Sequence, residues 1–229
     1  MITSAALCPA PPLLARELTG ADPVAPRLRQ ACLEAAGALL SDEPELVAIV
    51  GVAAETRAWP PDGQLDLAAY GPGLETTTSG PLVPLSLGLG SRLLDQVGHS
   101  GRRELQSVGE REPATACAAL GERLAGVGAR VALLVMADGS ARRGLKAPGY
   151  LDERSLPFDA TVERAIRAGD LPALLALDPE LAQDLMATGR AGWQVLAGAM
   201  NGHRPTTEVG YSGDPFGVAY LVATLRPRG

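Results

Sequence analysis

The chain contains few of the side chains on which catalytic and metal sites usually depend. Its 229 residues include two histidines, His99 and His203, three cysteines, and only 3% aromatic residues. The cysteines lack the short spacings of zinc sites and redox motifs, which argues against both of those classes. Their odd number favours reduced thiols and therefore a cytoplasmic protein, because disulfides form mainly in oxidising compartments.

Long apolar runs and clusters of positive charge are also missing. No stretch approaches the ~18 consecutive apolar residues of a membrane-spanning helix, so no membrane partner is expected. The net charge is −6 and the basic doublets are limited to Arg102-Arg103 and Arg142-Arg143, which argues against a nucleic-acid partner. What is present is ordinary for a globular protein, since 46% of the residues are hydrophobic and can form the core of one large domain.

Strands and helices are expected to alternate in the first part of the chain. Ile2 to Leu7, Leu46 to Val52 and Arg130 to Met136 are apolar runs with the length and β-branching of buried strands. Between the first two runs, Arg27 to Leu40 has apolar residues at helical spacing. This order is typical of an α/β fold. We therefore predict a single domain over residues 1–229 with a central mixed, largely parallel sheet flanked by helices.

Further elements are predicted from shorter patterns. Strands are expected at Gln64 to Ala69, Leu82 to Leu87, Leu105 to Val108, Glu208 to Tyr211 and Val218 to Leu225, and helices at Gly88 to Gly98, Pro113 to Leu124, Pro157 to Ala168, Leu171 to Leu177, Pro179 to Ala187 and Arg190 to Met200. Residues 53–79 lose periodicity among Pro, Gly and Thr, which favours a functional or edge loop. The Gly88-Leu89-Gly90-Ser91 segment is interpreted as a turn, either packed under the sheet or presenting amides to a phosphate.

Loops with small or polar residues follow three of the predicted strands. Ala10 comes after the first strand, Glu55 after the second and Asp138 after the strand that ends at Met136. The carboxyl ends of parallel strands meet at one edge of a sheet, where α/β proteins bind ligands, so we expect these loops to form one cleft. The residues expected to line this cleft are Ala10, Glu55, Trp59, Asp138, Ser140, Arg142 and Glu208.

Each of the more distinctive cleft residues has a plainer interpretation. Asp138 precedes Gly139 and is equally typical of a turn. Arg142 belongs to a basic doublet of the kind found on solvated surfaces. Trp59 is one of two tryptophans and can serve as a packing anchor. The two histidines lie beside glycines, and such loop histidines are usually exposed to solvent.

The order of several short motifs carries a resemblance to a known family. The motifs are Cys8-Pro9-Ala10-Pro11-Pro12-Leu13-Leu14, a strand ending at Gly51, Ala137-Asp138-Gly139-Ser140, Phe158-Asp159, Gly169-Asp170, Gly189-Arg190, Trp193-Gln194-Val195-Leu196-Ala197-Gly198-Ala199 and Pro215-Phe216-Gly217. In this order the chain resembles the class III extradiol dioxygenase superfamily, which contains the beta subunit of protocatechuate 4,5-dioxygenase and the Memo-like proteins. Within it, the chain is most similar to actinobacterial-type members.

The resemblance implies an α/β domain that, in active members, holds Fe(II) between two histidines and a carboxylate, with a further histidine as acid/base. This chain departs from that pattern at every mapped histidine. Ala10 stands in the first loop, Ala53-Ala54-Glu55 in the second, and the acid/base position falls near residues 140–142. Glu208 is the best match for the carboxylate. We therefore expect no cofactor, no metal ligand and no catalytic residue.

These observations favour a metal-free, non-catalytic relative that keeps an open cleft for a small ligand or a protein partner. The alternative is an active dioxygenase-like enzyme in which atypical ligands hold Fe(II), or in which metal-independent acid/base groups work in the same cleft. A structural subunit of a catalytic partner is a third interpretation, and a homo-oligomer is compatible with all three. We also expect an imidazole at position 10 to fit the cleft mouth with little effect on folding.

Overall fold

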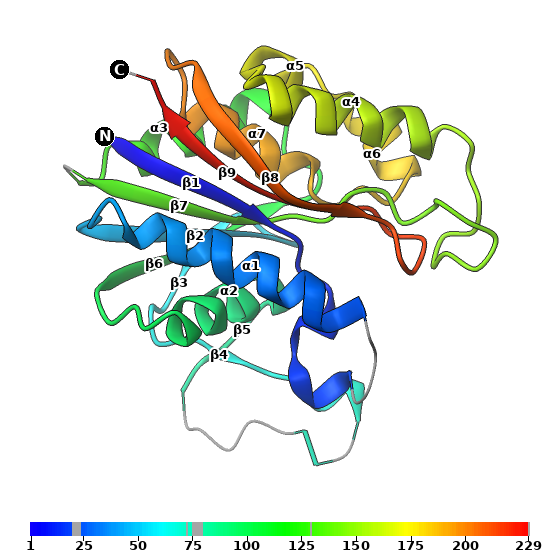
Figure 1. Cartoon of the computed structure of the whole chain (residues 1–229), viewed down its shortest axis with the longest axis horizontal. Coiled ribbons are helices and arrows are strands. Elements are labelled where there is room, and N and C mark those ends of the chain that lie inside the picture. The colour runs from blue at the N-terminus through cyan, green and yellow to red at the C-terminus, as the bar shows by residue number, and fades with distance from the viewer. Residues whose placement is uncertain (20–23, 72, 75–79, 129, 229) are drawn as a thin grey trace.

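A seven-stranded sheet runs through the centre of the computed structural model, which describes residues 1–19, 24–71, 73–74, 80–128 and 130–228 (Figure 1). The strands are β1 (Ile2–Cys8), β2 (Leu46–Ala53), β3 (Arg57–Trp59), β6 (Arg102–Gly109), β7 (Val131–Met136), β8 (Pro205–Gly213) and β9 (Tyr220–Pro227). Their order is β3-β6-β2-β7-β1-β9-β8. The four central strands are parallel, and β3, β9 and β8 pair antiparallel at the sides.

The central strands form because their side chains are apolar on both faces. Every residue of β7 is buried, as are the first six residues of β2. Such continuous apolar runs suit strands that are covered by helices on both sides. A second sheet of two short strands, β4 (Gln64–Leu65) and β5 (Leu82–Val83), lies apart from the central one.

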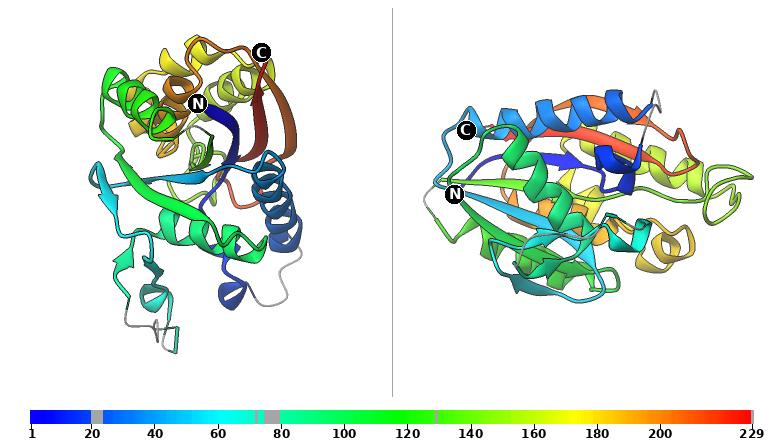
Figure 2. Two further views of the ribbon diagram at one scale, coloured as in Figure 1. Left: turned by 90° about the vertical axis from the view of Figure 1, so that its left-hand side faces the viewer. Right: turned by 90° about the horizontal axis from the view of Figure 1, so that it is seen from below.

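Two layers of helices cover the sheet (Figure 2). One face is covered by α1 (Val24–Leu40) and α2 (Leu85–Gln96), and the other by α3 (Ala114–Ala125), α4 (Ser155–Ala168), α5 (Leu171–Leu175), α6 (Pro179–Asp184) and α7 (Arg190–Ala199). Short 3-10 turns occupy Pro12–Leu14, Arg16–Leu18 and Ala68–Tyr70. Within the described part of the chain, no helix has the length and apolar character needed to cross a membrane.

Glycines bring α3 and α7 into close contact. A Cβ atom at Gly121 of α3 would overlap the carbonyl oxygen of Val195, and a Cβ atom at Gly198 of α7 would overlap the carbonyl oxygen of Ala118. The two backbones therefore touch at positions where only glycine fits. This contact fixes α7, whose first residue lies at the carboxyl edge of the sheet.

The predicted fold class is confirmed, and several local predictions are corrected. The strand expected at Leu82 to Leu87 ends at Val83, because Pro84 precedes the start of α2 at Leu85. The segment from Gly88 to Ser91 is therefore part of a helix, and the amide of Gly88 donates to the carbonyl of Pro84 at 3.0 Å. The turn interpretation, and with it the phosphate alternative, is wrong.

The irregular segment of residues 53–79 also holds more structure than its sequence indicates. It contains β3, which pairs with β6, and β4, which covers only the first two residues of the strand predicted from Gln64 to Ala69. Part of the predicted loose segment, residues 72 and 75–79, lies outside the described residues. Strands of two or three residues offer too short a pattern to be recognised from sequence.

Candidate functional site

The loops after β1, β2, β6 and β7 all lie at the carboxyl edge of the sheet, because these strands are parallel neighbours. Cys8 of β1 is in register with Met136 of β7, and Gly51 of β2 is in register with the same residue. The loops after β1 and β2 therefore start at the same level of the sheet. This edge is the place where an open α/β sheet binds its ligands.

Ala10 and Asp138 meet at this edge. The backbone amide of Ala10 donates to Oδ1 of Asp138 at 2.9 Å, and one step earlier the amide of Ala137 donates to the carbonyl of Cys8 at 2.8 Å. Ala10 is only 8% exposed, so its methyl group is part of the core and does not open onto the cleft mouth. The two loops are thus tied together through their backbones and one carboxylate.

Asp138 is a titratable group at this edge whose pKa is shifted towards neutrality. Burial raises its pKa to about 6, and the hydrogen bond from Ala10 opposes the rise only in part. The neighbouring Cys32 and Tyr220 have raised pKa values, Cys32 mainly through its hydrogen bond with Cys8 and through burial, and Tyr220 mainly through burial. The thiol and the phenol therefore stay neutral, whereas Asp138 can exchange a proton near neutral pH.

Ser140 points away from the predicted cleft. It is fully buried and bonded to Asp159 of α4 twice, through its amide at 3.0 Å and its hydroxyl at 2.5 Å. Burial raises the pKa of Asp159, and the two bonds from Ser140 counteract this effect. Arg143 lies 3.8 Å from the same carboxylate. Ser140 therefore anchors the loop to α4, a role that sequence analysis did not assign.

Arg142 is half-buried at the start of an irregular loop, where its guanidinium lies 3.7 Å from Asp152. The backbone of the loop is hydrogen-bonded, since the amide of Gly149 donates to Ala141 and that of Asp152 to Arg142, each at 3.0 Å. Its tip projects into solvent, with Tyr150 75% exposed. The loop is thus ordered by its own backbone contacts.

Glu55 and Trp59 belong to a separate network on the β3 side. The hydroxyl of Ser107 on β6 donates to the carbonyl of Glu55 at 2.6 Å and accepts from Trp59 Nε1 at 2.8 Å. The guanidinium of Arg57 lies over the indole of Trp59, 3.5 Å from the ring centroid. The side chain of Glu55 is exposed. Trp59 therefore holds β3 on β6, as the packing interpretation predicts.

Glu208 does not reach the Asp138 loop. It lies in the middle of β8, in register with Thr224 of β9. Its exposed side chain lines a small hollow together with Ala31 and Glu34 of α1. The expectation that Glu208 converges with Ala10 and Asp138 is therefore not met, because a residue in the middle of a strand cannot lie at its carboxyl end.

Both histidines of the chain lie at the amino edge of the sheet. His99 precedes β6 and its Nε2 lies 3.4 Å from the carbonyl oxygen of Arg102. His203 precedes β8, beside Met1 and Arg130, which come just before the starts of β1 and β7. The 6 residues of β7 separate the two edges by roughly 20 Å. Neither imidazole can act at the carboxyl edge.

The residues at the carboxyl edge do not fit an iron site. A facial triad needs two imidazoles and a carboxylate, whereas the two mapped loops offer methyl groups and the candidate carboxylate Glu208 is elsewhere. Across the described ranges, no three His, Cys, Asp or Glu side chains are grouped so that they could hold a metal ion. No chemical step through a metal is derived for this site.

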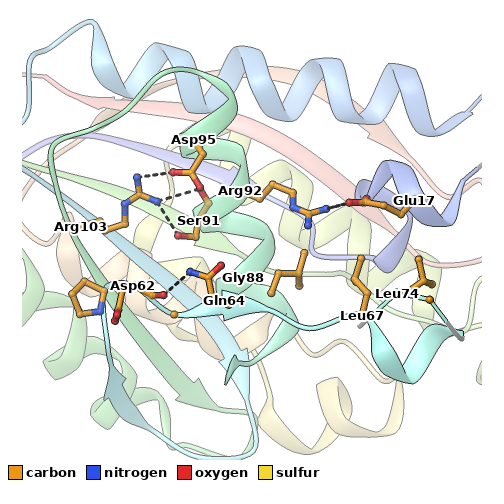
Figure 3. Close-up of a pocket in the computed structure, with 14 residues that line it drawn as sticks. Glu17, Asp62, Gln64, Leu67, Leu74, Gly88, Ser91, Arg92, Asp95 and Arg103 are labelled. Atoms are coloured by element: carbon orange, nitrogen blue, oxygen red, sulfur yellow. Dashed lines mark hydrogen bonds and ion pairs between the residues drawn. The ribbon is translucent and has the colours of Figure 1, made fainter. Parts of the chain in front are cut away.

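A hollow of about 560 Å³ lies beside α2, away from this edge. Figure 3 shows Arg92 turned towards Glu17 and Arg103 turned towards Asp95. Each guanidinium lies 2.8 Å from its carboxylate. Both cations are already neutralised, and the remaining charged side chain that the structure describes in this wall, Asp62, is acidic. The described part of the hollow therefore has no spare positive charge with which to hold an anion. It contains none of the seven residues predicted for the cleft.

The comparisons with known proteins bear on the fold. No protein-family model matches the sequence, and no curated protein matches it. The structure is similar to the crystal structure of the uncharacterized protein JW3007 from Escherichia coli K12, with a TM-score of 0.58 over 98% of this chain and 99% of that chain. The two chains are 12% identical. At this identity the likeness shows a common fold and carries no information about a ligand.

Proposed function

We propose that this protein is a metal-independent binding protein built on a class III extradiol dioxygenase-like scaffold, without ring-cleavage activity. The binding region that we propose is the carboxyl edge of the sheet around Ala10 and Asp138, where a small ligand or a segment of a partner protein would bind. We also place it in the cytoplasm, because its three cysteines are free and buried, which is typical of a reducing compartment.

The observation that carries this proposal is the position of His99 and His203 at the amino edge of the sheet. Ring cleavage in the resembled family needs imidazoles both to hold iron and to take a proton from the catechol. This chain has two histidines in all, and each is about a strand length away from the carboxyl edge of the sheet. The resemblance puts the first iron ligand at position 10. The buried methyl group of Ala10 and the hydrogen bond from its backbone amide to Asp138 support a metal-free function for this position.

The test compares iron binding with ring cleavage. Purified protein is dialysed against Fe(II) without oxygen, its iron content is measured, and then catechol and 3,4-dihydroxybenzoate are added with oxygen. We expect far less than one iron per chain and no yellow ring-cleavage product. Either about one tightly held iron per chain or turnover by the unmodified protein contradicts the proposal.

A second candidate function is metal-independent acid/base catalysis, and one observation favours it. Asp138 is half-buried at the ligand edge with a pKa of about 6, which suits a proton acceptor near neutral pH. Under this proposal Asp138 takes a proton from a bound carbon or oxygen acid. The quantity to measure is the rate of proton abstraction from such an acid. A rate that rises with pH through 6 and is lost in Asp138→Asn supports this candidate, and a rate that is unchanged in that variant excludes it.

A further inference from the structure

Arg190 is a buried cation at the carboxyl edge of the sheet. It is the first residue of α7 and is 2% exposed. Charged side chains are rarely buried to this extent unless an opposite charge accompanies them. Its surroundings therefore decide whether the positive charge is balanced by the chain itself.

Every recorded partner of this guanidinium is neutral. Nη1 donates to the carbonyl oxygen of Glu112 at 2.5 Å and to Gln194 Oε1 at 2.8 Å, and Nη2 donates to the carbonyl oxygen of Glu110. Nε is buried and has no hydrogen-bond partner. The adjacent Cys117 is a neutral thiol, because burial raises its pKa to about 11. Over the residues that the structure describes, no carboxylate forms an ion pair with Arg190.

The local backbone adds to this positive charge. The amino end of α7 has no side-chain cap, and a helix amino terminus has a partial positive charge. A buried ion without a counter-ion is strongly disfavoured, whereas a well-placed anion removes much of that cost. The guanidinium of Arg190 is therefore left without a paired counter-ion in the described part of the chain.

A cavity of about 270 Å³ adjoins Arg190 at this edge. Arg111 and Thr188 contribute polar atoms to its wall, and Pro179, Ala182 and Met186 contribute apolar ones. The cavity lies between the loop after β6 and the amino end of α7. The wall of the cavity thus combines the cationic residues Arg111 and Arg190 with aliphatic surface.

We propose that this cavity binds a small organic acid with one carboxylate and an apolar body, and that the carboxylate is the counter-ion of Arg190. A single negative charge suits the wall better than a phosphate dianion, because Glu110 also lines the cavity and repels additional charge. The aliphatic residues suit a hydrocarbon group. The proposal is independent of the function proposed above, since it involves neither Ala10 nor Asp138.

The experiment measures binding of benzoate to the full chain by isothermal titration calorimetry, with benzamide and inorganic phosphate as separate probes. Benzamide has the same ring without the charge, and phosphate has the charge without the ring. We expect benzoate to bind with a dissociation constant below about 10 mM and to raise the melting temperature. Benzamide and phosphate should each bind at least about tenfold more weakly.

The variant that tests the site supplies the missing charge and leaves Arg190 in place. Thr188→Asp puts a carboxylate into the cavity wall just before α7, where it competes with the probe. We expect this variant to bind benzoate at least about tenfold more weakly and to melt at a higher temperature than the parent without ligand. Thr206→Asp makes the same change at an exposed position on β8 and should bind benzoate as the parent does.

Three results overturn the proposal. The first is a parent protein that does not bind benzoate, or binds it with a dissociation constant above about 10 mM. The second is equal binding of benzamide or phosphate, since that would remove the need for a carboxylate on an apolar body. The third is benzoate binding by Thr188→Asp that equals binding by Thr206→Asp, because the probe would then occupy another place.

Discussion

The amide of Ala10 and the carboxylate of Asp138 meet at 2.9 Å although 128 positions separate them in the sequence. The bond closes the first-strand loop onto the loop after β7, at the edge where a ligand would enter. It also leaves one carboxylate half-buried with a single recorded donor. Burial outweighs that donor, so the carboxylate is held partly protonated near neutral pH.

We predict that Asp138→Asn stabilises the protein at pH 7. The pKa of Asp138 rises from 3.8 to about 6 on folding, so between these values the folded state binds more protons than the unfolded state. The contribution of this group to the free energy of unfolding is therefore greatest below pH 3.8 and falls until about pH 6. Two pKa units correspond to about 3 kcal/mol at most. The uncharged side chain of Asn removes this loss of stability. It also keeps an oxygen atom that can accept the hydrogen bond from the Ala10 amide.

The measurement is urea unfolding of the parent and of Asp138→Asn at several pH values between 4 and 8. We expect the variant to be more stable by about 1–3 kcal/mol at pH 7 and to lose part of the pH dependence. Glu153→Gln, at an exposed position, is the matched control and should change neither property. A variant that is less stable than the parent at pH 7 contradicts the assignment.

Ala10→His should destabilise the protein, contrary to what the sequence alone indicates. The methyl group of Ala10 is 8% exposed and belongs to the core on the α1 side, so an imidazole must displace its neighbours. Overpacking of this kind costs about 1–3 kcal/mol. Ala10→Ser is a smaller replacement and should cost less. Thermal melting distinguishes the two, and neither variant should cleave catechol with Fe(II) and oxygen.

The parts of the fold that can be predicted are those with long, regular patterns. Arg130 to Met136 is predicted as a strand and forms β7, because six consecutive apolar side chains need cover on both faces. Asp178 directly precedes the helix predicted from Pro179, a position where Asp is a common cap, and its carboxylate accepts from the amide of Glu180 at 2.9 Å. Both signals are local, so no knowledge of distant contacts is needed.

The candidate site is less predictable because it depends on pairs that are far apart in sequence. Ser140 follows a strand, yet its hydroxyl turns to Asp159 on α4, which no local pattern reveals. Arg190 begins a helix rich in small and apolar residues. A charged residue at the start of such a helix is visible in the sequence. That Arg190 has no counter-ion becomes known only when the structure shows its neighbours.

Ser107→Ala should loosen β3 from the sheet. Ser107 is fully buried. Its hydroxyl donates a hydrogen bond to the carbonyl of Glu55 and accepts one from the indole nitrogen of Trp59. Removing it leaves both groups without this partner, at a cost of about 1–3 kcal/mol. Tryptophan fluorescence emission should shift to longer wavelength as the indole of Trp59 becomes more exposed to water. Ser107→Thr retains the hydroxyl and should retain more of the parent emission; an unchanged spectrum in Ser107→Ala would contradict the network.

The contact between α3 and α7 gives a prediction about two glycines. Gly121→Ala should destabilise the protein strongly, because the new methyl group overlaps the backbone of Val195 and Ala199. Gly198→Ala should do the same, because its methyl group overlaps the backbone of Ala118. Backbone atoms cannot rotate away as side chains do, so the helices must separate. We expect each variant to lose more than about 2 kcal/mol, as overpacked cores do.

Gly37→Ala is the matched control in α1, where the nearest atom to the new methyl group is Val97 Cγ1 at 3.9 Å. That distance is ordinary van der Waals contact, so the higher helix propensity of alanine decides the outcome. The control should be stabilised by about 0.5–1 kcal/mol. Denaturant unfolding of the three variants compares the two effects directly. If Gly121→Ala matched Gly37→Ala, the helices could not be in backbone contact, and the position of Arg190 at the sheet edge would need another explanation.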